Sequence, residues 1–93
     1  MKLNITFDDN YEAQKLASLI FIKDGEETYI KAILNIIKNE LVILLKDKSA
    51  HSIMFKEEGH VEEFADFIQS VLDKEHKIIS TTVNDVNVEI VKG

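Results

Sequence analysis

The same succession of apolar and polar positions occurs twice along the chain, once in each half. Residues 3–7 alternate between apolar and polar side chains, as in a half-buried strand, and acids and an apolar helical stripe follow. Residues 53–55 open a second segment with the same order. Each helical stripe leads into two runs rich in β-branched residues, which a short polar turn separates. The pattern predicts a strand–helix–strand–strand unit used twice within one domain: repeat one spans residues 2–46, repeat two spans residues 51–92, and the domain spans residues 1–93.

The first predicted helix has a clear beginning and an ambiguous end. Asp8 or Asp9 can serve as the N-cap, and Glu12 stands three residues beyond Asp9 in the capping-box position. Gly25 suits the left-handed conformation that ends many helices, so the helix is expected to stop just before it. An alternative is a hairpin in which residues 19–23 pair with residues 28–33. The match to the second half of the chain favours the helix, and the sequence leaves both readings open.

The second helix and the two hairpins are easier to place. Residues 60–76 contain one apolar stripe at helical spacing. The first hairpin is expected over residues 29–46, with its turn at residues 37–40. The second is expected over residues 77–92, with Asn84 and Asp85 in a tight turn that needs positive φ angles.

These elements predict an α+β fold with pseudo-two-fold symmetry. Strand–helix–strand crossovers are right-handed, so the third strand of each unit is expected between the other two and antiparallel to them. The two units would then join into one antiparallel sheet of about six strands, with both helices packed on one face.

The two hairpins differ on the face that points away from the helices. Paired residues in a hairpin share a face, so the second hairpin is expected to be buried on one side and polar on the other. Its expected buried residues are Ile79, Thr81, Val83, Val86, Val88 and Ile90. Those of the first hairpin are Ile30, Ala32, Leu34, Ile36, Leu41, Ile43 and Leu45.

The reverse face of the first hairpin is unusually apolar. It carries Tyr29, Ile33, Val42 and Leu44, and no further element of the chain is left to cover it. Exposed apolar patches on small proteins mark interaction sites, so this patch predicts self-association, with a homodimer as the expected state. A strongly curled sheet that closes over these side chains is the alternative.

Composition narrows the classes of partner. The chain has 17 acidic and 11 basic residues, a net charge of −6, and all of its basic residues are Lys. Without Arg it cannot make bidentate contacts to phosphate or guanine, and its field repels nucleic acid, so direct nucleic-acid binding is disfavoured. The Lys-only, Ile-rich composition is typical of an AT-rich genome, such as that of a low-GC bacterium or its phages.

The chain is expected to be cytoplasmic. It has no Cys, so disulfides and thiolate chemistry are excluded. No secretory signal is visible at its beginning, and its longest apolar runs, residues 19–22 and 41–45, are far too short to span a membrane.

A row of polar side chains on the second helix is a candidate docking surface for a basic protein. The row consists of Glu62, Asp66, Gln69 and Asp73, at spacings of four, three and four. Such a row can mimic nucleic-acid phosphates or meet a basic surface. The alternative is that it is only the solvated face which every amphipathic helix needs.

Chemistry at a metal or catalytic centre has little support. His60 and Glu63 are three residues apart on the helix, with Glu57 or Glu58 nearby. Only two of these side chains are expected to point at one ion, whereas a divalent metal site needs three or four ligands. Therefore no metal is predicted. The chain also lacks a Gly-rich nucleophile turn and a phosphate-cradling loop, so neither an enzyme nor a cofactor is expected.

The sequence thus favours a small, acidic, non-enzymatic protein-binding module. By analogy with other acidic proteins, we expect an inhibitor or mimic that acts on a basic, nucleic-acid-handling partner. The alternative is a small-ligand or metal-binding domain that uses the groove between the helices or His60 with nearby acids. A structural subunit of a larger assembly is a third hypothesis.

Overall fold

The computed structural model describes residues 1–20 and 28–93 and has the expected α+β class. The two described helices are α1 and α2, and the six described strands are β1 to β6. Their order and bounds are β1 Lys2–Thr6, α1 Asn10–Leu19, β2 Ile30–Ile37, β3 Glu40–Leu45, β4 Ala50–Met54, α2 Glu58–Leu72, β5 Ile78–Asn84 and β6 Asn87–Lys92.

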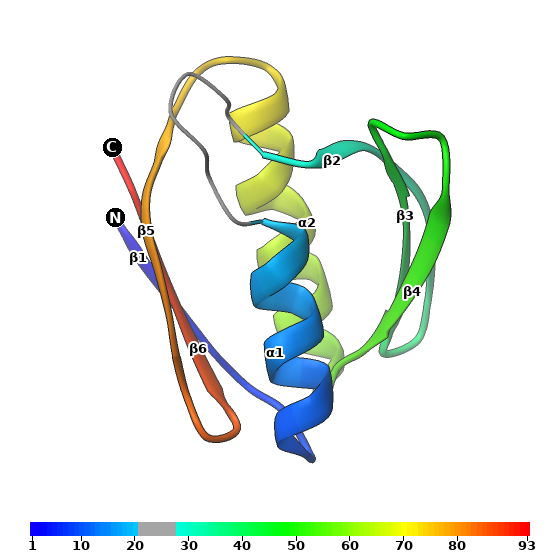
Figure 1. Cartoon of the computed structure of the whole chain (residues 1–93), viewed down its shortest axis with the longest axis vertical. Helices are drawn as coiled ribbons and strands as arrows, with labels where there is room; N and C mark the ends of the chain where they lie inside the picture. Colours follow the sequence, from blue (N-terminus) through cyan, green and yellow to red (C-terminus); the bar gives the residue numbers. More distant parts are fainter. Residues whose placement is uncertain (21–27) are drawn as a thin grey trace.

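The described strands form two antiparallel sheets of three, not one sheet of six. One sheet has the order β1-β6-β5 and the other has the order β2-β3-β4. Figure 1 shows them as separate layers on either side of the helices. Each sheet has an apolar side that supplies the core, and turning these two sides toward each other buries both of them. The predicted single sheet is therefore corrected to two facing sheets.

Each sheet combines a hairpin from one half of the chain with a strand from the other half. The third strand of each half, β3 or β6, is central and antiparallel to both neighbours, as expected. However, β1 pairs with β6 and β4 pairs with β3, so neither half forms the self-contained sheet that was predicted. Pairing within one half and pairing between the halves both place the same side chains of each strand on the core side. The pattern of apolar and polar residues therefore cannot distinguish the two arrangements.

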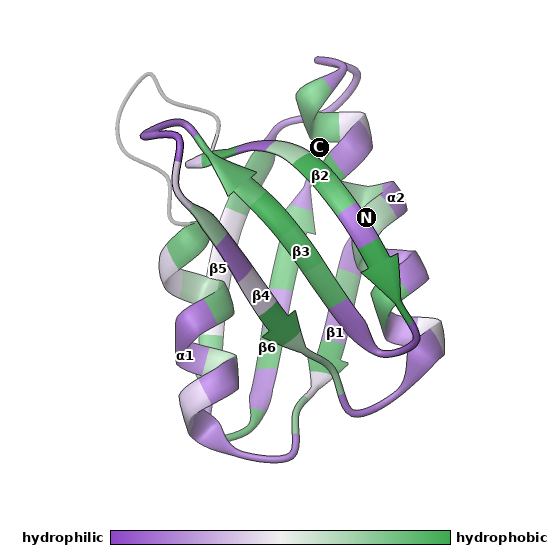
Figure 2. Cartoon of the chain, turned by 90° about the vertical axis from the view of Figure 1, so that its right-hand side faces the viewer, coloured by the Kyte–Doolittle hydropathy of each residue, from purple (hydrophilic) through white to green (hydrophobic). Residues whose placement is uncertain are grey.

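The two helices lie on opposite flanks of the space between the sheets (Figure 2). Helix α1 contacts β5 and β6 in one sheet and β4 in the other, whereas α2 contacts β2 and β3 in one sheet and β1 in the other. The helices were predicted to share one face of one sheet. They instead lie along the two sides that the facing sheets leave open. The core is therefore enclosed by the two sheets and the two helices.

The core is built from aliphatic side chains around three aromatic rings. Phe7, Phe55 and Phe64 are buried, with ring centroids 5.2 Å and 5.8 Å apart in successive tilted pairs. The rings come from the residue after β1, the residue after β4 and the middle of α2. This cluster therefore ties both halves of the chain to one centre.

Helix α1 begins where the sequence indicated. The Asp9 carboxylate accepts a 2.9 Å hydrogen bond from the Glu12 N–H, which satisfies a free donor of the first turn. The helix runs to Leu19, with Ile20 as its C-cap. The helical reading therefore holds through Leu19. The predicted end before Gly25, and residues 21–23 of the first strand of the alternative hairpin, lie outside the described residues.

Irregular pairing in two strands changes which side chains face the core. The register shifts twice in β2, between Ile30 and Ala32 and between Ile33 and Asn35. It shifts once in β5, between Ile78 and Ser80. An extra residue in one strand reverses the faces beyond it.

These shifts correct three of the predicted buried positions, and a fourth, Ile36, is 41% exposed although it pairs with the buried Leu41. Leu34 is 52% exposed and Ile79 is 65% exposed, while Ala32 pairs with Leu44 on the outer face. Ile33 and Ile78 take the inward positions instead. The second turn also moves by one residue: Asn84 pairs with Asn87, and Asp85 has the positive φ of 56°.

Candidate protein interface

The outer face of the β2-β3-β4 sheet is largely apolar. Cross-strand pairing places three rows of side chains on it: Ala32, Leu44 and Ala50; then Asn35, Val42 and Ser52; then Ile37, Glu40 and Met54. Ile37 and Met54 are 52% and 49% exposed, and Val42 and Leu44 are partly exposed. We call these nine residues the apolar face; its only ionisable side chain is that of Glu40.

The central strand explains why this face is apolar. Strand β3 reads Glu-Leu-Val-Ile-Leu-Leu, so both of its sides carry aliphatic residues. Figure 2 shows β3 as hydrophobic along nearly its whole length, whereas β6, the central strand of the other sheet, alternates. Because burial of Leu41, Ile43 and Leu45 already supplies the core side of β3, Val42 and Leu44 are not needed there.

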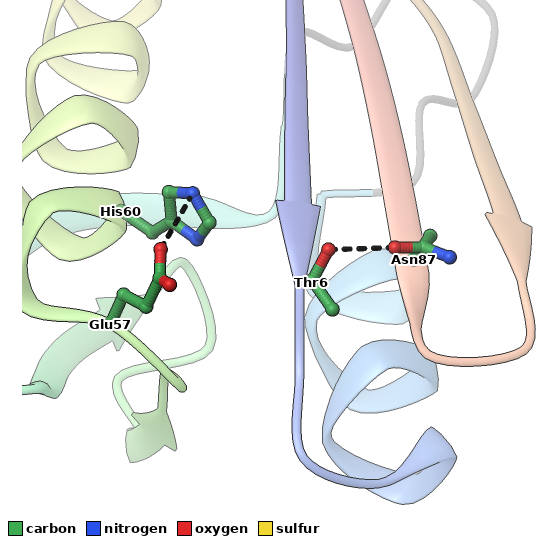
Figure 3. A network of polar contacts seen from close by, with 4 residues as sticks. All are labelled: Thr6, Glu57, His60 and Asn87. Carbon is green, nitrogen blue, oxygen red and sulfur yellow. Dashed lines mark hydrogen bonds and ion pairs between the residues drawn. The ribbon is translucent and has the colours of Figure 1, made fainter.

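The outer face of the other sheet is polar. Its cross-strand pairs carry Lys2, Asn4, Thr6, Ser80, Thr82, Asn84, Asn87, Glu89 and Val91. The Thr6 hydroxyl donates a 2.7 Å hydrogen bond to Asn87 Oδ1 (Figure 3), and Lys2 Nζ lies 3.7 Å from a Glu89 carboxylate oxygen. Polar side chains of β1 and β6 thus contact one another on this surface, and the face is polar, as the sequence predicted for this hairpin.

The predicted patch is reassigned in part. Val42 and Leu44 lie on the apolar face, but Tyr29 and Ile33 pack against the core. The two register shifts in β2 turn Ile33 inward, opposite Ile43. Sequence reasoning placed Ile37 on this face but left it out of the predicted patch, and it missed Met54 as a member of the face. Alternation around the buried Ile53 was the available signal for Met54, once β4 was paired with β3.

The free edge of β4 is covered by helix α1. The Lys15 ammonium donates a 2.7 Å hydrogen bond to the Ser52 carbonyl, and a Glu12 carboxylate oxygen accepts a 3.4 Å hydrogen bond from the Met54 N–H. Unpaired edge groups are the usual template for adding a strand from another chain. Since α1 occupies two of them, the face of this sheet is more accessible to a partner than its β4 edge.

The predicted acidic row is exposed on α2. Glu62, Asp66, Gln69 and Asp73 all face solvent, and Gln69 Nε2 donates a 3.0 Å hydrogen bond to Asp73 Oδ1. Asp73 is the C-cap of the helix. The opposite side of α2 packs into the core through Val61, Phe64, Ala65, Phe67, Ile68 and Val71. The role of the row as a docking surface stays a prediction.

The surroundings of His60 do not form a metal site. His60 Nε2 lies 3.5 Å from a Glu57 carboxylate oxygen (Figure 3), while its Nδ1 is buried without a hydrogen-bond partner. Within residues 1–20 and 28–93, no three His, Cys, Asp or Glu side chains gather closely enough to hold an ion. Helices α1 and α2 lie on opposite flanks of the molecule rather than side by side (Figure 2), and the ligand-binding alternative stays a prediction.

Neither helix of the described residues has the length and apolar character needed to cross a membrane. No protein-family model, curated protein or solved structure matches the chain.

Proposed function

We propose that the protein is a small, non-enzymatic protein-binding module whose apolar face binds a second copy of the same chain. The observation that supports this is the contrast between its two sheets. One outer face holds Ile37, Val42, Leu44 and Met54, and the other is polar apart from Val91. A folded chain gains nothing from exposed aliphatic side chains unless another surface covers them.

The charge distribution favours a second copy as the occupant. The chain carries a net charge of −6, yet the apolar face carries only Glu40, at the end of one row. Two copies can therefore stack these faces without bringing the exposed carboxylates of α2 together. Two sheets packed in this way lie about 10 Å apart, and the Asn35 and Ser52 side chains supply polar groups near the centre.

The area of the apolar face determines how stable the proposed dimer is expected to be. Three strands spaced about 4.8 Å apart, rising about 3.3 Å per residue over the length of β3, cover roughly 290 Å². Standard interfaces bury about 800 Å² per partner. We therefore expect a reversible dimer that dissociates on dilution, strengthened by the neighbouring exposed residue Leu34.

The proposal includes the repeat that the sequence predicted. If each element of one half is matched to its counterpart in the other, the order β1-β6-β5 becomes β4-β3-β2, which is the order of the second sheet. The two sheets would then be equivalent by origin. In that case the fold itself does not require an apolar outer face, because the equivalent sheet has a polar one. The difference is better explained by binding.

The acidic row is the second part of the proposal. Glu62, Asp66 and Asp73 would meet a basic protein, such as a nucleic-acid-handling enzyme that the protein inhibits. Helix α2 lies on the flank of the molecule (Figure 2), so a dimer formed through the apolar face leaves both rows accessible. The electrostatic attraction would weaken at high salt.

Sedimentation velocity over a dilution series tests the proposal. The wild type is expected to shift from dimer to monomer as it is diluted, and Val42→Glu to remain a folded monomer at every concentration. Val91→Glu is the matched control, because Val91 is the apolar residue on the outer face of the equivalent central strand β6. A wild type that stays monomeric throughout, or a Val42→Glu variant that dimerises like the wild type, would contradict the proposal.

A further inference from the structure

Lys92 is a buried cation near the end of β6. Its residue is 5% exposed, and its neighbour in β5 is the buried Ile78. The ammonium donates a 2.7 Å hydrogen bond to Ser70 Oγ on α2 and lies 4.5 Å from the centroid of the Phe67 ring. A Lys side chain is rarely buried to this extent unless a negative group accompanies it.

The described contacts of the Lys92 ammonium do not include a negatively charged group. An ammonium has three N–H donors, and Ser70 Oγ accepts from one of them. The Ser70 hydroxyl itself donates to the Phe67 carbonyl at 2.7 Å, so it is a neutral acceptor with its proton already engaged. The ring is also neutral. A buried charge is stabilised best by an opposite charge, and neither contact supplies one.

Lys92 lines an open pocket of about 480 Å³ between the β1 end of one sheet and helix α2. Its wall also contains two carboxylates, Glu63 and Asp66, and two further cationic groups. These are the Lys2 ammonium, 3.7 Å from a Glu89 carboxylate oxygen, and the Met1 amino group, which donates a 3.0 Å hydrogen bond to the Lys92 carbonyl. The remaining lining residues are Leu3 and Phe67. On α2, Glu63, Asp66, Phe67 and Ser70 recur at spacings of three, one and three, so they share one side of the helix.

We propose that this pocket binds an α-amino acid with an apolar side chain. The ligand carboxylate would accept hydrogen bonds from the Lys92 ammonium, and its ammonium group would pair with Glu63 or Asp66. Its side chain would lie against Leu3 and Phe67. The pocket is lined by both cationic groups and carboxylates, so it favours a zwitterion, which can pair with each kind. A ligand with only a negative charge would be repelled by the Glu63 and Asp66 carboxylates. A ligand with only a positive charge would be repelled by the Lys92 ammonium. The proposal is independent of the apolar face.

Titration of the ¹⁵N-labelled chain with three probes, followed by NMR, tests this assignment. The probes are L-leucine, 4-methylpentanoate, which lacks the amino group, and 3-methylbutylamine, which lacks the carboxylate. L-leucine is expected to shift the amide signals of Leu3, Phe67 and Lys92. Each of the other two probes is expected to bind at least about tenfold more weakly, because it forms one charge-assisted contact in place of two.

Two variants separate the predicted contacts from effects on folding. Lys92→Met keeps the apolar stem and removes the ammonium, and it is expected to weaken L-leucine binding by roughly 10- to 100-fold. Glu63→Gln combined with Asp66→Asn alters exposed positions only, so it tests the other end of the ligand even if Lys92→Met fails to fold. Lys77→Met, at an exposed position before β5, is the control and should leave binding unchanged.

Each contrary result overturns the assignment. Absence of any shift with L-leucine rejects the site. Equal binding of the amine alone indicates a cation site at Glu63 and Asp66, and equal binding of the carboxylate alone, or of inorganic phosphate, indicates an anion site. Unchanged L-leucine affinity in folded Lys92→Met would show that the ammonium has no part in binding.

Discussion

The ammonium of Lys15 on α1 donates a 2.7 Å hydrogen bond to the backbone carbonyl of Ser52 on β4. The two residues come from different halves of the chain. Together with the Glu12 contact to the Met54 N–H, this bond covers polar groups at the free edge of an edge strand. Protein sheets are commonly protected from unwanted strand pairing by such charged coverings.

Removal of this covering is expected to cost little stability. Because the bond is exposed, Lys15→Met should lower the free energy of unfolding by about 0.5–1 kcal/mol, which urea denaturation measures. Gln14→Met, at the exposed neighbouring position of α1, is the control and should change stability by less. Equal losses in both variants would mean that the Ser52 contact contributes nothing.

The register shift in β5 predicts opposite outcomes for two adjacent isoleucines. Ile78 is 6% exposed and Ile79 is 65% exposed. Ile78→Ala should therefore cost about 2–5 kcal/mol, a large part of the roughly 5–14 kcal/mol expected for a domain of this size. Ile79→Thr should stay within about 0.5 kcal/mol of the wild type. Thermal or urea unfolding compares them, and the reverse order would place the register shift elsewhere.

The turn between β3 and β4 gives a prediction about acid titration. The Ser49 hydroxyl and the Ser49 N–H both donate to Asp47 Oδ1, at 2.5 Å and 2.9 Å. The hydroxyl bond, followed by the backbone bond, lowers the pKa of Asp47 below 3.8. Since the folded-state pKa is the lower one, the contribution to stability is present above about pH 4 and is lost as the pH falls through the folded-state value.

Substitution of Ser49 tests the cause of that pKa shift. In Ser49→Ala the pKa of Asp47 should rise toward 3.8, as followed by the NMR signal of its carboxyl carbon. Ser49→Thr retains a hydroxyl and should keep the pKa low. A pKa that does not move in Ser49→Ala would show that the hydroxyl bond is not the main cause.

The acidic row predicts where a basic partner binds. A lysine-rich peptide added to the ¹⁵N-labelled chain should shift the amides around Glu62, Asp66 and Asp73, and the shifts should shrink as salt is added. Charge reversal of these three positions to Lys should abolish the shifts without unfolding the chain. Shifts of equal size around Asp8 and Asp9, at the start of α1, would mean that the peptide responds only to net charge.

Local signals in the sequence were sufficient for several features of the fold. The acids at Asp8 and Asp9, with Glu12 beyond them, indicated the start of α1, and the structure selects Asp9 as the cap. The inward positions of Val88 and Ile90 followed from simple alternation. The excess of apolar residues in β3 identified Val42 and Leu44 as members of an unusual face. Each of these conclusions depends on side chains that lie within one element or one turn.

The remaining features depend on long-range pairing and irregular strands. Nothing in β1 itself distinguishes pairing with β6 from pairing with β3, since both leave Ile5 inward, so the exchange of strands was not predictable. The register shifts in β2 exchanged the roles of Ile33 and Leu34 without any Gly or Pro to mark them. Met54 entered the candidate interface only because β4 joins β3. The burial of Lys92 likewise required β6 and α2 to meet.

The most direct test of the apolar face is an isotope-filtered NOE measurement on a mixture of ¹³C-labelled and unlabelled chains. If two copies stack through this face, contacts between chains should join the methyl groups of Val42, Leu44 and Met54 in one copy to those in the other. Val91 should show none. Contacts between chains that involve Val91 but not Val42, or their complete absence at concentrations where the chain sediments as a dimer, would contradict binding through the apolar face.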